Sequence, residues 1–372
     1  MNDAPVKAGT RLRAGLLVAV GSLAAVMVLA EVALRLVRPI RLSEEVEYIS
    51  DGHLGARLAP GKTYALKGGG LCSINAQGFR GTRDTAPVGP AGTIRVVALG
   101  GSSTICFDSD DARTWCALLE RMLREHYRRD VEVVNAGVPG YSVFESKINY
   151  QYRLRHLHPD VVVVYHTWND IKYFKSIEAG WFPDKQPWRP TWRRQLKSVA
   201  RRFQLGRRVR LFLNEVVYPR RRENMFAQAD PATAITPDGA AHRWERQNYR
   251  DLAALASVDG VPVVFATQAS LVADSTIAKP DVRGVLYVEY ANMSFDELAR
   301  EWDAVTAIIR DTAAETGACL ADVRSRVPAD REHFADHVHL TDRGNEAVAR
   351  AIFDEMTACA QVDSVLRGPG DR

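Results

Sequence analysis

Four short stretches of the chain carry residue types that can do chemistry on an ester. They are Gly100-Gly101-Ser102-Ser103, Asn135 to Gly140, Asn169-Asp170 and Asp336 to His339. A serine beside glycines can act as a nucleophile, because the missing side chains let the substrate and backbone N–H groups approach the hydroxyl. An Asp three residues before a His can orient its imidazole as a base. The combination predicts acyl transfer to a serine, as in a serine esterase or acyltransferase.

Two of these stretches could donate hydrogen bonds to an oxyanion. Asn169 follows a wholly apolar run, where an amide must find partners, and its NH₂ group can stabilise developing negative charge. Asn135 to Gly140 is by itself typical of a turn between a strand and a helix. Each stretch alone also has a structural explanation, since the serines could be ordinary helix caps and the Asn-Asp pair could cap loops. Their occurrence in one order favours a functional site.

Alternating strands and helices are predicted around these stretches. Apolar runs predict strands at 95–99, 131–134, 160–165, 261–267 and 318–322, and helical spacing predicts helices at 112–128, 142–157, 249–256, 295–316 and 342–359. Strands joined by helical crossovers form parallel sheets, and ligands bind beyond the carboxyl ends of such strands. Ser102, Gly140 and Asn169 all fall at these ends. We therefore expect an α/β domain with a central parallel sheet.

The order of the four stretches resembles the SGNH hydrolases, also called the GDSL esterase family, whose sequence blocks are centred on Ser, Gly, Asn and His. The resemblance implies a flavodoxin-like, three-layer α/β/α fold and no cofactor. It implies that Ser102 is the nucleophile, and that its backbone N–H forms the oxyanion hole with Gly140 and the Asn169 side chain. It further implies that His339 is the general base and that Asp336 orients it.

The resemblance covers residues 72 to 357, with departures from the family pattern. The aspartate that precedes the family's serine is Gly101 here, the following leucine is Ser103, and the glycine that opens the third block is Thr167. Membrane-anchored members resemble this chain more closely, because they share the Gly-Gly-Ser turn and an upstream Asn-x-x-Gly-Phe-Arg-Gly, which is residues 75–81 here. No departure removes a group with an implied catalytic role.

An apolar segment near the N-terminus, Ala14 to Val37, is long enough to cross a membrane as a helix. Three basic residues precede it in a short tail, which suits a signal anchor with the tail in the cytoplasm and the remaining chain outside. The alternative is signal-peptide cleavage after Ala30. We favour the anchor because apolar residues continue through Leu36.

These observations predict a linear organisation of the chain. We expect a cytoplasmic tail at 1–13, an anchor at 14–37, an extended segment at 38–94, the hydrolase domain at 95–360 with an insertion at about 171–247, and a tail at 361–372. The five cysteines are too few for a disulfide scaffold and do not decide the compartment.

The insertion is strongly basic. Between Lys185 and Arg222 there are 13 lysines and arginines and one acidic residue, Glu215. Helical spacing places Trp192, Leu196, Val199 and Phe203 on one stripe, with the basic residues Arg193, Arg194, Lys197, Arg201 and Arg202 around it. This pattern predicts a basic amphipathic helix. It could be a lid packed on its own domain, or it could bind an anionic membrane surface or glycan; no nucleic-acid partner is expected.

A metal site is a weaker alternative for the C-terminal stretch. His333, His337 and His339 lie near Asp336, but no partner motif completes a zinc-ligand set, so we expect no metal. Cys106, close to the serine, is expected to be a small buried residue.

The leading hypothesis is a membrane-anchored extracytoplasmic esterase that hydrolyses an O-acyl ester, with O-acetyl groups of a cell-surface polysaccharide as the favoured substrate by analogy with anchored relatives. An O-acyltransferase of exported glycans and an inactive glycan-binding or assembly factor are the alternatives.

Overall fold

The apolar runs form one sheet in the computed structural model, which describes residues 4–37, 47–66, 69–90, 92–182, 203–212, 230, 232–273 and 293–368. The sheet has five strands in the order β6-β5-β7-β8-β9, and all neighbouring strands are parallel. The strands are β5 Ile94–Gly100, β6 Val131–Asn135, β7 Val161–His166, β8 Val263–Thr267 and β9 Cys319–Ala321. This is the flavodoxin-like order, with its switch point beside the first strand. The predicted fold class is confirmed.

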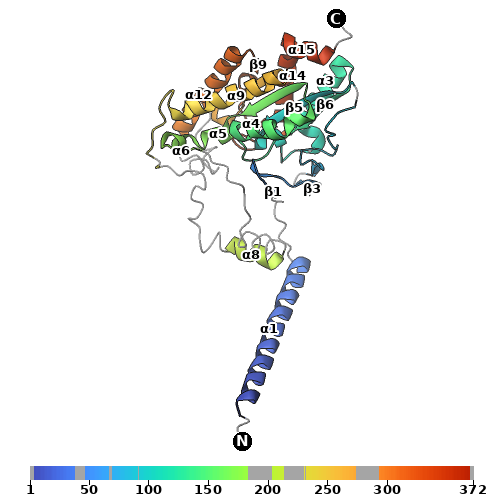
Figure 1. Ribbon diagram of the computed structural model, residues 1–372, viewed down its shortest axis with the longest axis vertical. Coiled ribbons are helices and arrows are strands. Elements are labelled where there is room, and N and C mark those ends of the chain that lie inside the picture. The colour runs from blue at the N-terminus through green and yellow to red at the C-terminus, as the bar shows by residue number, and fades with distance from the viewer. Residues whose placement is uncertain are drawn as a thin grey trace. The chain divides into compact units, whose positions relative to one another are not determined.

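Helices cover both faces of this sheet (Figure 1). One face packs against α4 (Val143–Tyr152), α9 (Ala240–Val258) and α12 (Phe295–Thr316), and the other against α3 (Trp115–Tyr127), α14 (Asp342–Ala358) and α15 (Ala360–Arg367). Successive strand residues alternate between the two cores, as the pleat requires: Val97 and Leu99 enter one, Val96 and Ala98 the other. Both faces of the strands are buried, which explains why these runs do not alternate between apolar and polar residues.

Short helices connect these elements. They are α2 Ser102–Ile105, α5 Trp168–Ile171, α6 Phe174–Glu178 and α13 Val323–Arg326, with 3-10 turns η1 Asp111–Arg113, η2 Leu154–Leu157 and η4 Leu271–Ala273. Two of them, α2 and α5, begin directly beyond the carboxyl ends of β5 and β7. They therefore lie where the sequence predicts the site.

The helix α12 has the bounds that the sequence predicts, because both of its ends carry strong local signals. The Ser294 hydroxyl accepts the backbone N–H of Glu297 at 3.2 Å, and the Glu297 carboxylate accepts the backbone N–H of Ser294 at 2.8 Å. Gly317 ends the helix in the left-handed conformation, with a φ of 72°. The helix α15 was not predicted; Gly368 ends it with a φ of 74°, but its N-cap residue Cys359 makes no side-chain capping hydrogen bond.

The segment before β5 contains four short strands rather than a merely extended chain. β1 (Tyr48–Asp51) pairs with β2 (Gly55–Leu58), and β3 (Lys62–Ala65) pairs with β4 (Leu71–Ile74), both antiparallel. These strands are four residues long, too short for periodicity to reveal them.

The Asn-x-x-Gly-Phe-Arg-Gly motif attaches this segment to the edge strand β6. The Asn75 carboxamide oxygen accepts the backbone N–H of Phe79 at 2.9 Å, which closes the turn. Arg80 then donates its backbone N–H to the carbonyl of Asn135, and its buried guanidinium forms an ion pair with Asp111 at 3.1 Å. The motif therefore has a structural role, because it covers an otherwise open sheet edge.

A second unit comprises residues 1–45 and 189–222. Its helix α1 (Ala4–Val37) contains a segment, Leu17–Leu36, that is long and apolar enough to cross a membrane. The Glu31 carboxylate accepts the backbone N–H groups of Gln204 and Leu205 at 2.9 and 3.0 Å, at the start of α8 (Gln204–Phe212). The predicted basic helix with Arg193, Arg194, Lys197, Arg201 and Arg202 lies outside the described residues.

Candidate active site

Ser102 lies at the first position of α2, directly beyond the end of β5. Both glycines before it are required by close packing. A Cβ on Gly100 would lie 1.8 Å from the Thr104 hydroxyl oxygen, and a Cβ on Gly101 would lie 2.3 Å from the Asn169 amide nitrogen. The turn can therefore hold no larger side chain, which explains why Gly101 stands where the family pattern has aspartate.

A continuous hydrogen-bond chain joins Ser102, His339 and Asp336. His339 Nε2 lies 2.8 Å from the Ser102 hydroxyl oxygen, and His339 Nδ1 lies 2.6 Å from Asp336 Oδ2. Asp336 Oδ1 accepts the backbone N–H groups of Val338 and His339 at 2.9 and 2.7 Å. The carboxylate thus fixes both the imidazole and the turn that carries it. The sequence-predicted group of three is assembled from chain segments 237 residues apart.

The pKa shifts of the histidine and the aspartate suit a base that is held by an ionised carboxylate. Burial alone would raise the pKa of Asp336, but the hydrogen bonds of His337 and His339 and the charge of His339 outweigh burial and hold the pKa well below its ordinary range. Burial lowers the pKa of His339, but the hydrogen bond and charge of Asp336 outweigh burial, so the net effect is a raised pKa. For His337, burial dominates and lowers the pKa to about 4, so this neighbour stays neutral.

Asn169 lies on the other side of the serine turn. It follows β7 within α5, and its amide nitrogen donates to the Tyr141 carbonyl at 2.8 Å. The same nitrogen would lie 2.3 Å from a Cβ on Gly101. The amide has two N–H groups, so one remains for another acceptor. Asn169 therefore lies beside the turn that carries Ser102.

Gly140 precedes Tyr141 and is brought to the same edge. Its φ of 85° lies in the left-handed region, and a Cβ there would meet nothing within 4 Å. The conformation, not a lack of space, thus favours glycine here. The buried Lys172 ammonium donates to the Gly140 carbonyl at 2.7 Å and fixes this peptide. Lys172 was not predicted from the sequence; the signal was a lysine in an otherwise apolar run directly after Asn169-Asp170.

Thr167, where the family pattern has glycine, needs no special backbone freedom. Its φ is −178°, an extended value open to any residue. Cys106 is buried, as the sequence predicted, and burial raises the pKa of its thiol to about 12. Within the described residues, no group of three or more His, Cys, Asp or Glu side chains could hold a metal ion.

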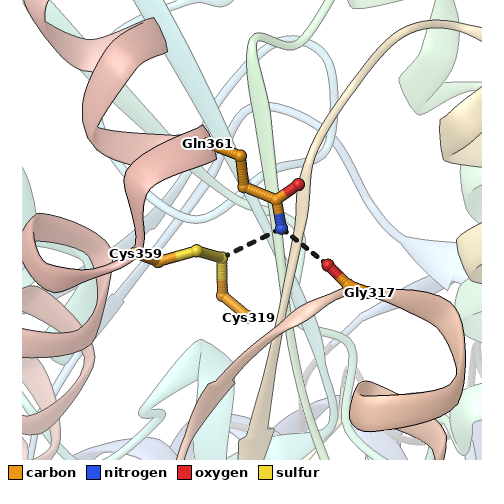
Figure 2. The surroundings of a disulfide bond; sticks show 4 residues. All are labelled: Gly317, Cys319, Cys359 and Gln361. Atoms are coloured by element: carbon orange, nitrogen blue, oxygen red, sulfur yellow. Dashed lines mark hydrogen bonds between the residues drawn. A yellow bond between two sulfur atoms is a disulfide. The ribbon is translucent and has the colours of Figure 1, made fainter.

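A disulfide joins Cys319 at the start of β9 to Cys359 at the end of α14 (Figure 2). The Gln361 amide nitrogen donates to the Gly317 carbonyl at 2.8 Å beside it. The other three cysteines are buried and unpaired. The sequence did not predict this pairing, because the 40-residue separation carries no signal of spatial contact.

Comparisons with known proteins identify the family. Residues 98–347 match the model of the GDSL-like lipase/acylhydrolase family. No curated protein sequence matches the chain significantly.

Among solved structures, the chain is similar to LAE5, an α/β hydrolase from the metagenome of Lake Arreo, Spain, with 16% identity, a TM-score of 0.42, and coverage of 72% of this chain and 95% of that one. It is similar to TesA, with 14% identity, a TM-score of 0.42, and coverage of 71% and 99%. It is also similar to Axe2, an acetylxylan esterase from Geobacillus stearothermophilus, with 13% identity, a TM-score of 0.42, and coverage of 70% and 93%. Because the family model matches more than half of the chain, this protein belongs to the GDSL-like lipase/acylhydrolase family and is an ester-hydrolysing enzyme.

Proposed function

We propose that this enzyme is a membrane-anchored, extracytoplasmic serine esterase that removes O-acyl groups, with O-acetyl groups on a cell-surface polysaccharide as its substrate class. The observation that carries the proposal is the hydrogen-bond chain from Ser102 through His339 to Asp336.

In the proposed reaction, His339 Nε2 takes the proton of the Ser102 hydroxyl as the oxygen attacks the acyl carbonyl. The oxyanion then accepts hydrogen bonds from the Ser102 and Gly140 backbone N–H groups and from the Asn169 side chain. Loss of one such donor typically costs about 3–4 kcal/mol of transition-state stabilisation.

Collapse of this intermediate breaks the ester bond, and the imidazolium returns its proton to the leaving alcohol. The ionised Asp336 stabilises the imidazolium throughout. Water, deprotonated by His339, then attacks the acyl-serine, so that the acid leaves and Ser102 regains its proton.

Two features support an extracytoplasmic location. Helix α1 offers a segment able to span a membrane, and the disulfide Cys319–Cys359 is of the kind that persists in oxidising compartments. When the protein is extracted from cells into denaturant without a reductant, a thiol reagent should label three of the five cysteines, and all five only after reduction. Labelling of all five without reduction would contradict this location.

The surroundings of Ser102 support a small acyl group on a bulky alcohol. The turn that carries Ser102 is tightly packed, since Gly101 has no room for a Cβ beside Asn169. Space is open at Gly140, where a Cβ would meet nothing within 4 Å, and the His339 side chain is 31% exposed. An acetyl group on a hydrated sugar fits this asymmetry.

The test uses the full-length protein in detergent micelles with a nitrophenyl acetate and an O-acetylated polysaccharide. We expect acetate release from both substrates, its loss in Ser102→Ala, and its retention in Ser325→Ala, a control at an exposed serine of α13. Equal activity in Ser102→Ala and the unmodified enzyme would refute the proposal. Acetyl groups appearing on an added oligosaccharide would instead indicate the O-acyltransferase. Binding of glycan without acetate release would indicate the inactive binding factor.

A further inference from the structure

Ser103, where the family pattern has leucine, carries a buried hydroxyl directly behind the candidate nucleophile. Its side chain is enclosed, with 3% of the residue exposed. The hydroxyl donates to the Val338 carbonyl at 3.1 Å, and it accepts a hydrogen bond from Gln268 Nε2 at 2.9 Å. Since a hydroxyl has one hydrogen to give, the acceptor role toward Gln268 and the donor role toward Val338 are both determined.

Gln268 extends this series of hydrogen bonds to a third segment of the protein. It follows β8 directly, and only 5% of it is exposed. The side-chain carboxamide oxygen of Gln268 accepts the backbone N–H of Trp168 at 2.8 Å, and the backbone carbonyl of Gln268 accepts the Trp302 indole N–H at 3.0 Å. Both ends of the carboxamide are therefore used, in a single orientation.

The groups joined by this network are sequence neighbours of the residues proposed to do the chemistry. Ser103 follows Ser102, Trp168 precedes Asn169, and Val338 precedes His339. One glutamine side chain thus connects the carboxyl ends of β5, β7 and β8 with the turn of the base. In a buried setting, where water cannot replace a lost partner, such bonds restrict the relative positions of the segments.

We infer that Gln268 and Ser103 are positioning residues that hold the nucleophile, the oxyanion donor and the base in register. This inference rests on the proposed function of Ser102, Asn169 and His339. Neither residue touches the reacting atoms; the network acts by fixing the backbone on either side of them.

The predicted signature is a loss of kcat at nearly constant KM. In Gln268→Met, a substitution of similar volume, we expect kcat to fall about 10- to 100-fold and KM to change about twofold or less, because misplaced groups affect the transition state more than substrate binding. Ser103→Ala should show the same pattern, and Ser103→Thr, which retains the hydroxyl, should restore most of kcat.

The two residues should also act as one unit. Because the Gln268 amide reaches Val338 only through Ser103, the double variant Ser103→Ala with Gln268→Met should lose little more kcat than either single variant. The control is Gln361→Met, the same substitution at a glutamine whose hydrogen bonds lie beside the disulfide. It should leave kcat unchanged.

The experiment measures kcat and KM for nitrophenyl acetate, and Tm, on the full-length protein and these variants beside Ser102→Ala. If Gln268→Met keeps its kcat while Ser102→Ala is inactive, the positioning role is wrong and the proposed function stands. If Ser102→Ala is as active as the unmodified protein, the proposed function fails first. Fully multiplicative losses in the double variant, or a loss of kcat in Gln361→Met as large as in Gln268→Met, would also overturn the inference.

Discussion

Two turns flank Ser102, and each contains an aspartate, but their environments differ sharply. Asp336 is half-buried and accepts hydrogen bonds from the backbone of its own turn and from two imidazoles. Asp170 is fully buried, and its Oδ1 accepts the backbone N–H of Val143 at 2.7 Å, whereas its Oδ2 has no hydrogen-bond partner among the described residues. The number of donors, rather than the residue type, separates them.

The charge states follow from this difference. The pKa of Asp336 is held well below its ordinary range, whereas burial raises the pKa of Asp170, and the nearby charge of Glu145 adds to that rise. Glu245 on α9 is also buried; burial and the charge of Asp170 raise its pKa, and neither of its carboxylate oxygens has a hydrogen-bond partner among the described residues. A carboxyl with a lowered pKa thus lies where an imidazolium must be stabilised, and carboxyls with raised pKa values lie in the buried region behind Asn169.

The largest contrast should come from removing the charge at Asp336. In Asp336→Asn the imidazole loses the acceptor that fixes its tautomer, and we expect kcat to fall by about 10⁴-fold. Asp170→Asn removes an acid whose pKa is raised and which makes no contact with His339, and it should change kcat by about threefold or less. Steady-state kinetics with nitrophenyl acetate decides the matter, and similar losses in the two variants would remove the distinction between the turns.

A smaller loss is expected at Asn169, the neighbour of Asp170. Because its amide is one of three proposed oxyanion donors, Asn169→Ala should lower kcat about 10²- to 10³-fold with little change in KM. Asn248→Ala, which removes a buried amide on α9 that donates to the Trp244 carbonyl, serves as the control. An unaltered kcat in Asn169→Ala would mean that this turn contributes structure only.

A smaller effect of the Asp336 charge is expected on the pH dependence of the activity. His339 must be neutral to act as a base, and its pKa is raised, so activity should be lost on acidification at a pH above the ordinary histidine value of about 6.5. In Asp336→Asn, the residual activity should persist to lower pH. The measurement is the pH at which kcat/KM falls by half on acidification. If this pH is the same in Asp336→Asn and the unmodified enzyme, Asp336 does not raise the pKa of His339.

The smallest effect concerns stability. A carboxyl whose pKa is raised in the folded state supports folding while it is protonated, and this support is lost as the pH rises through the raised pKa. The Tm of the unmodified protein should therefore fall toward alkaline pH, whereas Glu245→Gln should flatten that fall by an amount on the order of a few degrees. Thermal unfolding of both proteins across neutral and alkaline pH tests this, and parallel curves would exclude Glu245 as the titrating group.

Local patterns predicted the strands of the sheet and the residues Ser102, Asp336 and His339, because each depends on a signal within a single segment. The five apolar strands are present within two residues of their predicted ends, and Ser102, Asp336 and His339 are in contact. Pairings across the fold were not predicted: Lys172 with Gly140, and Cys319 with Cys359, depend on tertiary structure that no local pattern encodes.

Gln268 is an instructive omission. Asn169 was selected because a polar amide follows a wholly apolar strand and must find partners, and Gln268 follows β8 in the same way. The position of Gln268 after a buried strand therefore predicts a functional or structural amide as strongly as that of Asn169. It could not have identified the partners, since Ser103 lies 165 residues away.

The contact between Glu31 and α8 means that the N-terminal helix is not freely exchangeable. The Glu31 carboxylate accepts the first N–H groups of a helix only nine residues long, a length at which capping matters to whether a helix forms. A chimera bearing another protein's anchor, or a secreted version cut after residue 37, would leave these groups to water. Engineers who want the hydrolase without its apolar helix should therefore also shorten the 189–222 segment, or supply a Ser, Asp or Asn directly before Gln204.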